Sequence, residues 1–257
     1  MKIVLIGAGN LATNLGKALL KRGHEVMQVW SRTKSSASML ANKLHCSYTT
    51  NMEEVVREAD LFIIAVKDDV LSKVADVLSD GRENQFFVHT AGSMPMDVLP
   101  TERRGVLYPM QTFSKQKEVD FSVIPCFIEA NHEEDFLLLR AIALTICLDV
   151  FALNSENRKY LHLAAVFCCN FANHCYTLGE QMLKEHGNIP FGVMLPLIEE
   201  TAAKLHTLSP SEAQTGPAVR WDENVMNKHV QLLADKPNVQ EIYELMSKSI
   251  HSTLSHD

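Results

Sequence analysis

The chain has 257 residues and a net charge of −7, and 46% of its residues are hydrophobic. This is the composition of an ordinary globular protein, and its acidic balance excludes a basic surface suited to nucleic acid or to an anionic membrane. The apolar run after Lys2 is too short for a secretory signal, and no uninterrupted apolar run reaches the roughly 18 residues needed to span a bilayer. We therefore expect a cytoplasmic protein.

The N-terminal segment predicts a dinucleotide-binding unit. The apolar run Ile3–Ile6 suits a buried parallel strand, and Gly7-x-Gly9-x-x-Ala12 follows it directly and opens an amphipathic helix. In this pattern Gly7 allows a tight turn, Gly9 lets the backbone approach a pyrophosphate, and Ala12 permits close packing of helix against strand. Free amides of the first helical turn would face the phosphates. The predicted cofactor contacts are Gly7, Gly9, Asn10, Leu11 and Ala12.

The end of the second predicted strand favours NADP over NAD. A carboxylate about 20 positions beyond the glycines would bind a free ribose 2′-hydroxyl, but this chain has Trp30-Ser31-Arg32-Thr33-Lys34 there. These hydroxyl and cationic groups suit a 2′-phosphate instead. We therefore predict that Ser31, Arg32 and Thr33 bind the cofactor. The alternative is a solvated turn in which one serine caps the next helix.

Strand-like apolar runs alternate with amphipathic stretches up to about residue 154. The run 61–66 is apolar throughout, as expected of a strand buried on both faces. This rhythm predicts an α/β fold over residues 1–154, namely a Rossmann domain with a doubly wound, mostly parallel sheet of about eight strands. Further strands are predicted at 26–30, 47–49, 86–89, 106–108, 122–128 and 150–153, with helices at 35–44, 67–78 and 136–147.

From Glu156 onward the pattern is helical, because apolar residues recur at helical spacing and no good strand follows. This predicts an all-α C-terminal domain over residues 155–257. Its first helix would run for roughly thirty residues, to the stop Gly187-Asn188-Ile189-Pro190. The sequence Ser209-Pro210-Ser211-Glu212 has a capping-box pattern that predicts another helix start. Later helices are predicted at 193–208, 223–234 and 239–254.

The six cysteines form no C-x-x-C pair and no zinc spacing. Cys168, Cys169, His174 and Cys175 cluster, which raises the possibility of a metal ion. They lie in a predicted helix, however, where cysteine commonly serves as a small apolar residue. We expect reduced, mostly buried thiols and no metal site.

Four motifs carry a resemblance that covers almost the whole chain: HTAGS at 89–93, YPMQTF at 108–113, AAVFCCNF at 164–171 and TGPAVR at 215–220. The chain resembles the NADP-dependent Rossmann oxidoreductases related to pyrroline-5-carboxylate reductase and the 6-phosphogluconate and 3-hydroxyacid dehydrogenases. It resembles most a subgroup with a helical C-terminal domain of unassigned function, which implies a homodimer through that domain. In the 3-hydroxyacid dehydrogenases a lysine precedes an asparagine by four residues on the interdomain helix. This chain has Asn170 but Val166, so that chemistry does not transfer.

Ligands of an open parallel sheet bind beyond the carboxyl ends of the strands. Ala65 and Val66 end one predicted strand, and Thr90 and Gly92 follow the next, so we expect these four residues to line the cofactor. His89 lies at the same edge and could protonate a hydride acceptor, since an imidazole titrates near neutrality. The alternative for His89 is a strand-end histidine hydrogen-bonded to the backbone.

A polar stripe runs along the long predicted helix when about 100° is allowed per residue. We interpret it as the wall of an interdomain cleft in which His162 and Asn170 act in catalysis and Asn173 binds substrate. The alternatives are a dimer seam or a solvated face. The stripe comprises His162, Cys169, Asn173, Tyr176 and Glu180, with Asn170 at its edge.

Two further residues are candidates for substrate binding. Arg220 could clamp a carboxylate, although pairing with Asp222 or Glu223 would also explain it, and Gln111 follows Pro109 near the strand ends. The leading hypothesis is a reductase that moves hydride from NADPH to a C=O or C=N bond of a small polar metabolite. The alternative is a non-catalytic NADP-binding sensor or scaffold.

Overall fold

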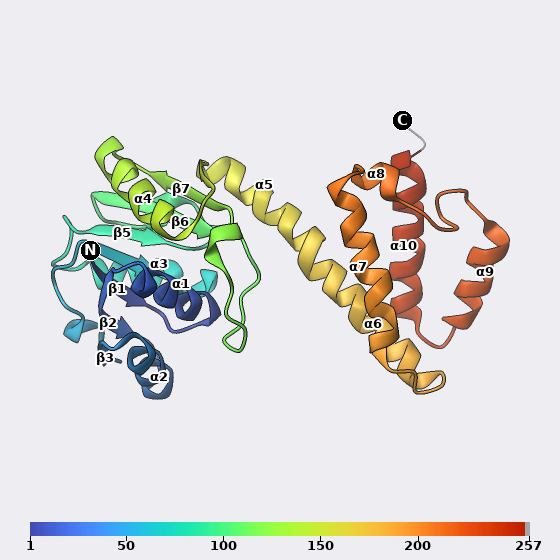
Figure 1. Cartoon of the computed structure of the whole chain (residues 1–257), viewed down its shortest axis with the longest axis horizontal. Coiled ribbons are helices and arrows are strands. Elements are labelled where there is room, and N and C mark those ends of the chain that lie inside the picture. The colour runs from blue at the N-terminus through green and yellow to red at the C-terminus, as the bar shows by residue number, and fades with distance from the viewer. Residues whose placement is uncertain (255–257) are drawn as a thin grey trace. The chain divides into compact units, whose positions relative to one another are not determined.

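The computed structural model describes residues 1–254, which form two compact units, Met1–Cys169 and the residues from Asn170 onward (Figure 1). The first unit contains the sheet and the second is helical, as the fold class predicted from the sequence requires. Within the described residues, no helix combines the length and the apolar character needed to cross a membrane.

The first unit is built on an eight-stranded sheet with the order β3-β2-β1-β4-β5-β6-β7-β8. All neighbouring strands run parallel except β6 and β7, which are antiparallel. The predicted mostly parallel, doubly wound sheet is therefore confirmed. The strands are β1 (Lys2–Ile6), β2 (Glu25–Trp30), β3 (Ser47–Thr49), β4 (Leu61–Ile64), β5 (Phe86–His89), β6 (Arg103–Pro109), β7 (Cys126–Ala130) and β8 (Val150–Ala152).

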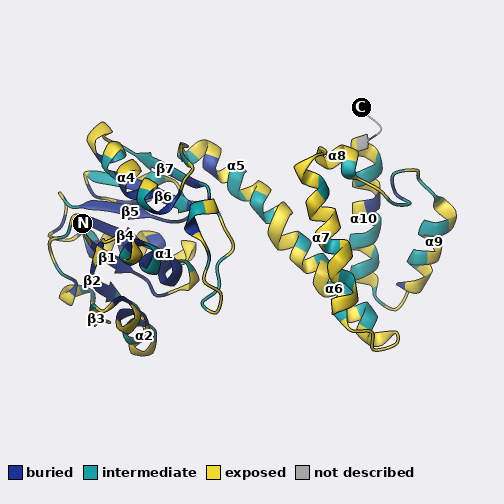
Figure 2. Cartoon of the chain, in the orientation of Figure 1, coloured by how far each residue is buried: buried dark blue, intermediate teal, exposed yellow. Residues whose placement is uncertain are grey.

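Helices cover both faces of this sheet because alternate side chains of each strand point to opposite faces. Ile3 and Leu5 of β1 join the core beneath α1 (Asn10–Lys21), α2 (Lys34–Leu44) and α4 (Glu133–Ile146). Val4 and Ile6 join the core beneath α3 (Asp68–Ser79). These four side chains of β1 are fully buried, whereas Lys2 is exposed, and Figure 2 shows the strands as the buried centre of this unit.

The predicted strand 122–128 is wrong in its first half. A short 3₁₀ helix occupies Phe121–Val123, and β7 begins only at Cys126. The Asp120 carboxylate accepts hydrogen bonds from both the amide and the hydroxyl of Ser122, at 2.9 and 2.7 Å. This local turn competes with strand pairing, and Pro125 has no N–H to offer a neighbouring strand.

The long predicted helix is present over Ser155–Glu185, but it contains an irregular turn. An α-helical segment, α5 (Ser155–Ala165), leads into a π-helical segment at Val166–Phe171 and then into α6 (Ala172–Glu185). The i→i+5 hydrogen bonds of a π segment change the rotation per residue. The polar stripe was predicted with a constant rotation of about 100° per residue from His162 to Glu180. This rotation does not hold across residues 166–171, so the prediction of a single regular stripe is wrong.

The second unit continues with short helical elements. They are two 3₁₀ helices (Phe191–Met194 and Lys204–His206), α7 (Leu195–Ala203), α8 (Pro210–Ala213), α9 (Glu223–Leu232) and α10 (Pro237–Leu254). The capping box that begins α8 is confirmed, because the Ser209 side chain accepts from the Glu212 amide while the Glu212 side chain accepts from the Ser209 amide. Figure 2 shows that most of this unit's surface is exposed or half-buried.

The expectation of mostly buried thiols is wrong. Cys126 and Cys147 are buried in the first unit's core, but Cys168 and Cys169 are exposed on the π-helical segment, and the remaining two are half-buried. Within residues 1–254, no group of three His, Cys, Asp or Glu side chains is arranged to hold a metal ion.

Candidate functional site

The glycine loop after β1 is fixed by two requirements that only glycine meets. Gly7 has a φ of +121°, and a Cβ there would lie 2.2 Å from the carbonyl oxygen of Ala65. The amide of Gly7 donates to the carbonyl of Trp30 at 2.8 Å, which ties the loop to β2. The loop therefore turns tightly over the ends of β1, β2 and β4.

The N-terminus of α1 is uncapped and has no acidic side chain in its first turn. Its N-cap residue is Gly9, which provides no side-chain cap. A Cβ at Gly9 would meet nothing within 4 Å, so the backbone there can be approached closely. The first amides of a helix have no acceptor in the helix itself, which leaves those of Asn10, Leu11 and Ala12 to bind phosphate oxygens. These residues fit a pyrophosphate.

The loop after β2 offers an exposed cation beside this site. Thr33 caps α2 through its hydroxyl, which accepts from the Ser36 amide at 3.4 Å, so the capping residue is a threonine and not a serine. The Ser31 amide donates to the Thr49 carbonyl at 3.3 Å. Arg32 is exposed and makes no salt bridge with any residue in the range 1–254. Its guanidinium therefore fits the 2′-phosphate of NADP.

Two further cations near the glycine loop, both lysines, were missed by the sequence analysis. Lys43 of α2 and Lys115 line a shallow pocket together with Ala8, which lies between the two cofactor glycines. The segment that carries Lys115 is held on α1 because the Asn14 side chain donates to the Ser114 carbonyl at 2.9 Å. This contact links residues far apart in the sequence, so no local pattern could indicate it.

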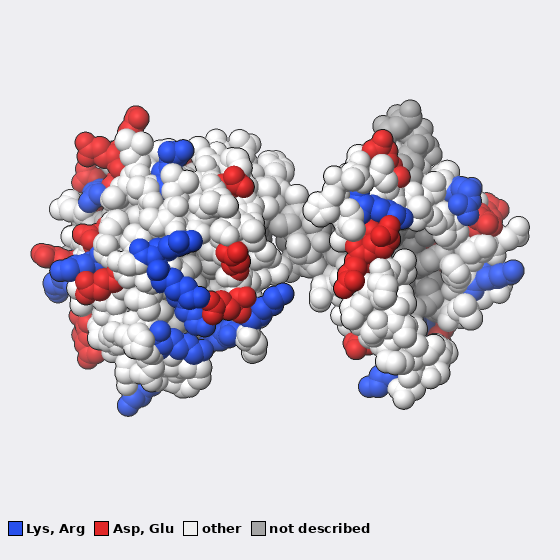
Figure 3. Space-filling view, in the orientation of Figure 1, with Lys and Arg blue, Asp and Glu red and all other residues white. Residues whose placement is uncertain are grey.

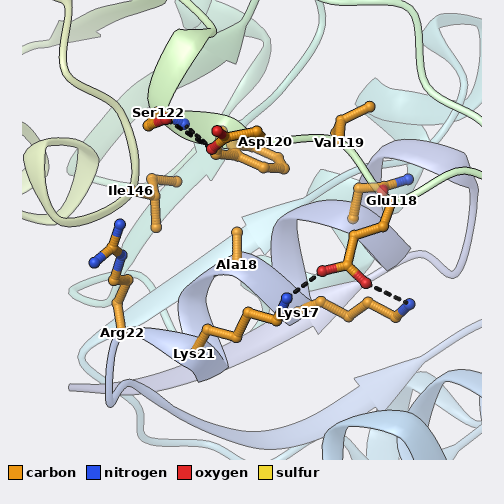
Figure 4. Close-up of a pocket in the computed structure, with 11 residues that line it drawn as sticks. Lys17, Ala18, Lys21, Arg22, Glu118, Val119, Asp120, Ser122 and Ile146 are labelled. Carbon is orange, nitrogen blue, oxygen red and sulfur yellow. Dashed lines mark hydrogen bonds and ion pairs between the residues drawn. The ribbon is translucent and has the colours of Figure 1, made fainter.

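A larger cavity of the first unit lies along the second half of α1. Its volume is about 730 Å³, and Figure 4 shows Glu118 pairing with Lys17 and Lys21 across it. Figure 3 shows Lys and Arg side chains gathered over this side of the unit. The residues of α1 that line this cavity begin at Asn14, and none of residues 7–12 is among them.

His89 is buried and engaged at both ring nitrogens. Nδ1 accepts from the Ala91 amide at 3.1 Å, and Nε2 lies 3.2 Å from the Pro95 carbonyl oxygen. Burial, aided by the positive charge of Arg158, lowers the pKa of His89 to about 4, so the ring is neutral at physiological pH. This geometry favours the alternative of a histidine bound to the backbone, which here shapes the loop after β5.

The loop after β5 also packs against a second histidine. Nδ1 of His162, on α5, lies 3.1 Å from the Tyr108 hydroxyl at the end of β6. A Cβ on Gly92 would lie 2.6 Å from that Nδ1 and 2.9 Å from Cζ of Tyr108. The Thr90 amide donates to the Ile64 carbonyl at 3.2 Å, which joins this loop to β4 and to the neighbouring Ala65 and Val66.

Arg158 anchors α5 one turn before His162. Its guanidinium donates to the Glu129 carboxylate of β7 at 2.6 Å, to the Met94 carbonyl at 2.6 Å and to the Ser155 hydroxyl at 3.1 Å. The side chain is 1% exposed. Because residues four apart share a helix face, this anchor holds His162 toward the strand ends. Tyr108 and Arg158 were missed because their partners are distant in sequence.

The other predicted substrate residues are exposed. The Gln111 side-chain oxygen accepts from the amide and hydroxyl of Thr112, at 2.8 and 3.3 Å. Asn170, Asn173 and Arg220 belong to the second unit. Among the described residues, Arg220 forms no salt bridge: Asp222 caps α9, and Glu223 accepts from the Trp221 indole at 3.2 Å.

Two family models and a set of solved structures match this chain. Residues 2–92 match the family described as NADP oxidoreductase coenzyme F420-dependent, and residues 124–250 match a domain of unknown function, DUF2520. A solved structure from Bacteroides fragilis, described as an NADP oxidoreductase, is 54% identical, with a TM-score of 0.93 over 98% of each chain. A search of curated proteins finds no significant match.

More distant solved structures share the fold. An imine reductase from Myxococcus stipitatus in complex with NADP⁺ is 17% identical, with a TM-score of 0.69 over 100% of this chain and 95% of that one. A pyrroline-5-carboxylate reductase from Coxiella burnetii is 16% identical, with a TM-score of 0.58 over 99% of this chain and 97% of that one.

Proposed function

The chain belongs to the NADP oxidoreductases that join an N-terminal domain of the coenzyme F420-dependent NADP oxidoreductase type to DUF2520, and we propose that it reduces a C=O or C=N group of a small polar metabolite. Its cofactor is NADP, and it is an enzyme. One observation carries the proposal: the glycine loop that leads into the uncapped start of α1 and the loop that carries Gly92 follow the carboxyl ends of the parallel strands β1 and β5, and the imidazole of His162 packs against Gly92.

The order of the strands relates these two features. A cofactor whose pyrophosphate lies at the start of α1, and whose 2′-phosphate lies at Arg32, extends from β2 across β1 toward β4. Adjacent strands are about 4.8 Å apart, and β5 follows β4 in the sheet. The nicotinamide half would therefore reach the loop after β5, where Gly92 and His162 pack together.

The roles of the chain's residues follow from this placement. NADPH supplies the hydride to the carbon of the acceptor when it is bound. The oxygen or nitrogen of the acceptor then needs a proton, and His162 would donate it. We assign His89 a bracing role instead, because both of its ring nitrogens are engaged by backbone groups.

Exposed polar residues are the candidates for substrate binding. We propose that Asn170 orients the reacting group and that Gln111, Asn173 and Arg220 bind the rest of the substrate. Arg220 suits a carboxylate because a guanidinium can bind one through two parallel hydrogen bonds. That neither Asp222 nor Glu223 pairs with it among the described residues supports this role.

We further propose a homodimer formed through the helical unit. The segment 189–208 exposes several large apolar side chains, and soluble monomers rarely expose such patches without a binding role. A monomeric mass at micromolar concentration would contradict this proposal. The exposed apolar residues are Ile189, Val193, Leu195, Leu197, Leu205 and Leu208.

We propose a cytoplasmic location because the six cysteines are free, as in a reducing compartment.

The enzymatic proposal is tested by following NADPH oxidation with a panel of cyclic imines, 2-oxo acids and aldehydes. His162→Gln should lower kcat by about 100-fold or more, while NADPH affinity stays unchanged. The exposed His174 provides a matched control, since His174→Gln should leave kcat unchanged. Tight NADPH binding without turnover across the panel would favour a sensor or scaffold.

A further inference from the structure

The hydrogen shared by Tyr108 and His162 can be placed from the surroundings of the phenol. The two rings meet edge to face with centroids 6.1 Å apart, and the hydroxyl lies 3.1 Å from Nδ1. Burial raises the pKa of Tyr108, so the phenol keeps its proton at neutral pH. Among residues 1–254, Nδ1 of His162 is the hydrogen-bond partner of this hydroxyl. The phenol O–H can therefore donate to Nδ1, and this direction uses the proton that the phenol keeps.

A neutral imidazole carries one N–H, so an Nδ1 that accepts a hydrogen bond leaves the hydrogen on Nε2. The same tautomer holds for His89, where Nδ1 accepts from the Ala91 amide. For His162 the donor Nε2–H makes no hydrogen bond with a described residue, and Nε2 is not among the buried polar atoms that lack a partner. This N–H is therefore accessible.

Gly92 closes the other side of the ring. A Cβ there would lie 2.6 Å from Nδ1 and 2.9 Å from Cζ of Tyr108, so the backbone at residue 92 lies directly against both groups. Nδ1 is enclosed by the phenol and this backbone, while Nε2 stays open. Arg158, 1% exposed and held by Glu129, keeps α5 in place one turn earlier. The imidazole can thus present one nitrogen to a ligand.

We propose that Tyr108 is a positioning residue that holds His162 as the Nε2–H tautomer and so presents this N–H to the hydride acceptor. As Nε2 gives its proton to the acceptor, the phenol proton of Tyr108 moves to Nδ1, so the imidazole stays neutral, and the phenolate then regains a proton from solvent. The presentation to an acceptor rests on the proposed reductase function. The tautomer itself depends only on the contacts among Tyr108, His162 and Gly92.

Nitrogen NMR of the full chain with NADP⁺ bound tests the tautomer without a substrate. The protein is labelled with ¹⁵N in the histidine rings, and the His162 signals are those missing from His162→Gln. Neutral His162 should show an unprotonated Nδ1 and a protonated Nε2, and Tyr108→Phe should convert it to a mixture of tautomers. Tyr160→Phe, at a 65% exposed residue of the same helix, should change nothing. A wild-type ring protonated at Nδ1, or an unaltered tautomer in Tyr108→Phe, overturns the proposal.

Turnover separates this proposal from the reductase function. With any substrate of the panel, Tyr108→Phe should lower kcat about tenfold and leave the KM for NADPH unchanged, whereas Tyr160→Phe should match the wild type. Unchanged kcat in Tyr108→Phe would overturn the positioning role. The expected NMR signature without turnover on any substrate would contradict the reductase function alone.

Discussion

Gly92 and His162 pack so closely that a Cβ on Gly92 would lie 2.6 Å from Nδ1 of the imidazole. Real Cβ atoms essentially never come so near another heavy atom, so residue 92 must lack a side chain for His162 to keep its position. The loop that would receive the nicotinamide is thereby in direct contact with the proposed proton donor.

Gly92→Ala tests this contact directly. The added methyl group must displace the imidazole from Tyr108, so kcat should fall at least about tenfold while the protein still binds NADPH. Gly179→Ala is the matched control, because a Cβ there meets nothing within 4 Å and the residue lies in α6. Steady-state kinetics and calorimetric NADPH binding distinguish the two variants. Wild-type kcat in Gly92→Ala would show that this contact is unimportant.

Gly7→Ala should weaken cofactor binding. Its methyl group would lie 2.2 Å from the Ala65 carbonyl oxygen, and a φ of +121° is strained for any other residue. The dissociation constant for NADPH, measured by calorimetry, should rise at least about tenfold, since strain of this kind costs about 1–3 kcal/mol. Gly192→Ala meets no neighbouring atom and should bind as the wild type does. Undiminished affinity in Gly7→Ala would place the pyrophosphate elsewhere.

Arg32→Gln should weaken NADPH binding far more than NADH binding. A hydrogen bond to a charged group contributes about 1.5–3 kcal/mol, so the NADPH dissociation constant should rise about 10- to 100-fold. Lys73→Gln removes a cation from α3, which packs on the other face of the sheet, and should change neither affinity. Equal losses for both cofactors in Arg32→Gln would show that Arg32 does not select the 2′-phosphate.

We predict that His89 lowers the free energy of unfolding of the protein in mildly acidic solution. Burial lowers its pKa to about 4 in the folded protein, whereas the unfolded chain binds the proton near pH 6.5. Its contribution is full above about pH 6.5 and is lost as the pH falls toward about 4, which amounts to about 3 kcal/mol. Urea unfolding at pH 7.5 and 5 should therefore show a smaller loss of stability in His89→Asn than in the wild type. Identical losses in the wild type and in His89→Asn would mean that folding does not lower the pKa of His89.

Arg158→Met should destabilise the first unit. It leaves the Glu129 carboxylate without its guanidinium partner, and breaking a buried pair typically costs about 3–5 kcal/mol. Lys159→Met removes the exposed neighbouring pair with Glu156 and should change the free energy of unfolding little. Urea unfolding compares the two variants. Equal stability of the two would show that Arg158 is not the anchor of α5.

The local patterns of the sequence predicted much of the fold. The apolar run before Gly7 and the small residues at positions 9 and 12 were sufficient to place β1, the glycine loop and α1, because backbone geometry there depends on neighbouring residues. The family resemblance and the NADP cofactor are confirmed by the matches over 2–92 and 124–250. The π-helical turn at Val166–Phe171 has no comparable signal, and so the extrapolated stripe was wrong.

The candidate site depends on contacts that sequence spacing does not encode. His162 could be singled out as a polar residue on a helix, but its partner Tyr108 lies 54 positions earlier. His89 could be placed at a strand end, yet only the fold shows that Ala91 and Pro95 engage both of its nitrogens. The proposed roles of Asn170, Asn173, Arg220 and Gln111 stay predictions for mutagenesis.

Isotope transfer from NADPH deuterated at the hydride-donating carbon tests the central claim most directly. Mass spectrometry of the products from the panel should find deuterium on the reduced carbon of at least one imine, 2-oxo acid or aldehyde. His162→Gln should lose most of that product while it still binds NADPH. Saturation of the protein with NADPH without deuterium transfer to any member of the panel, or undiminished transfer by His162→Gln, would contradict the account.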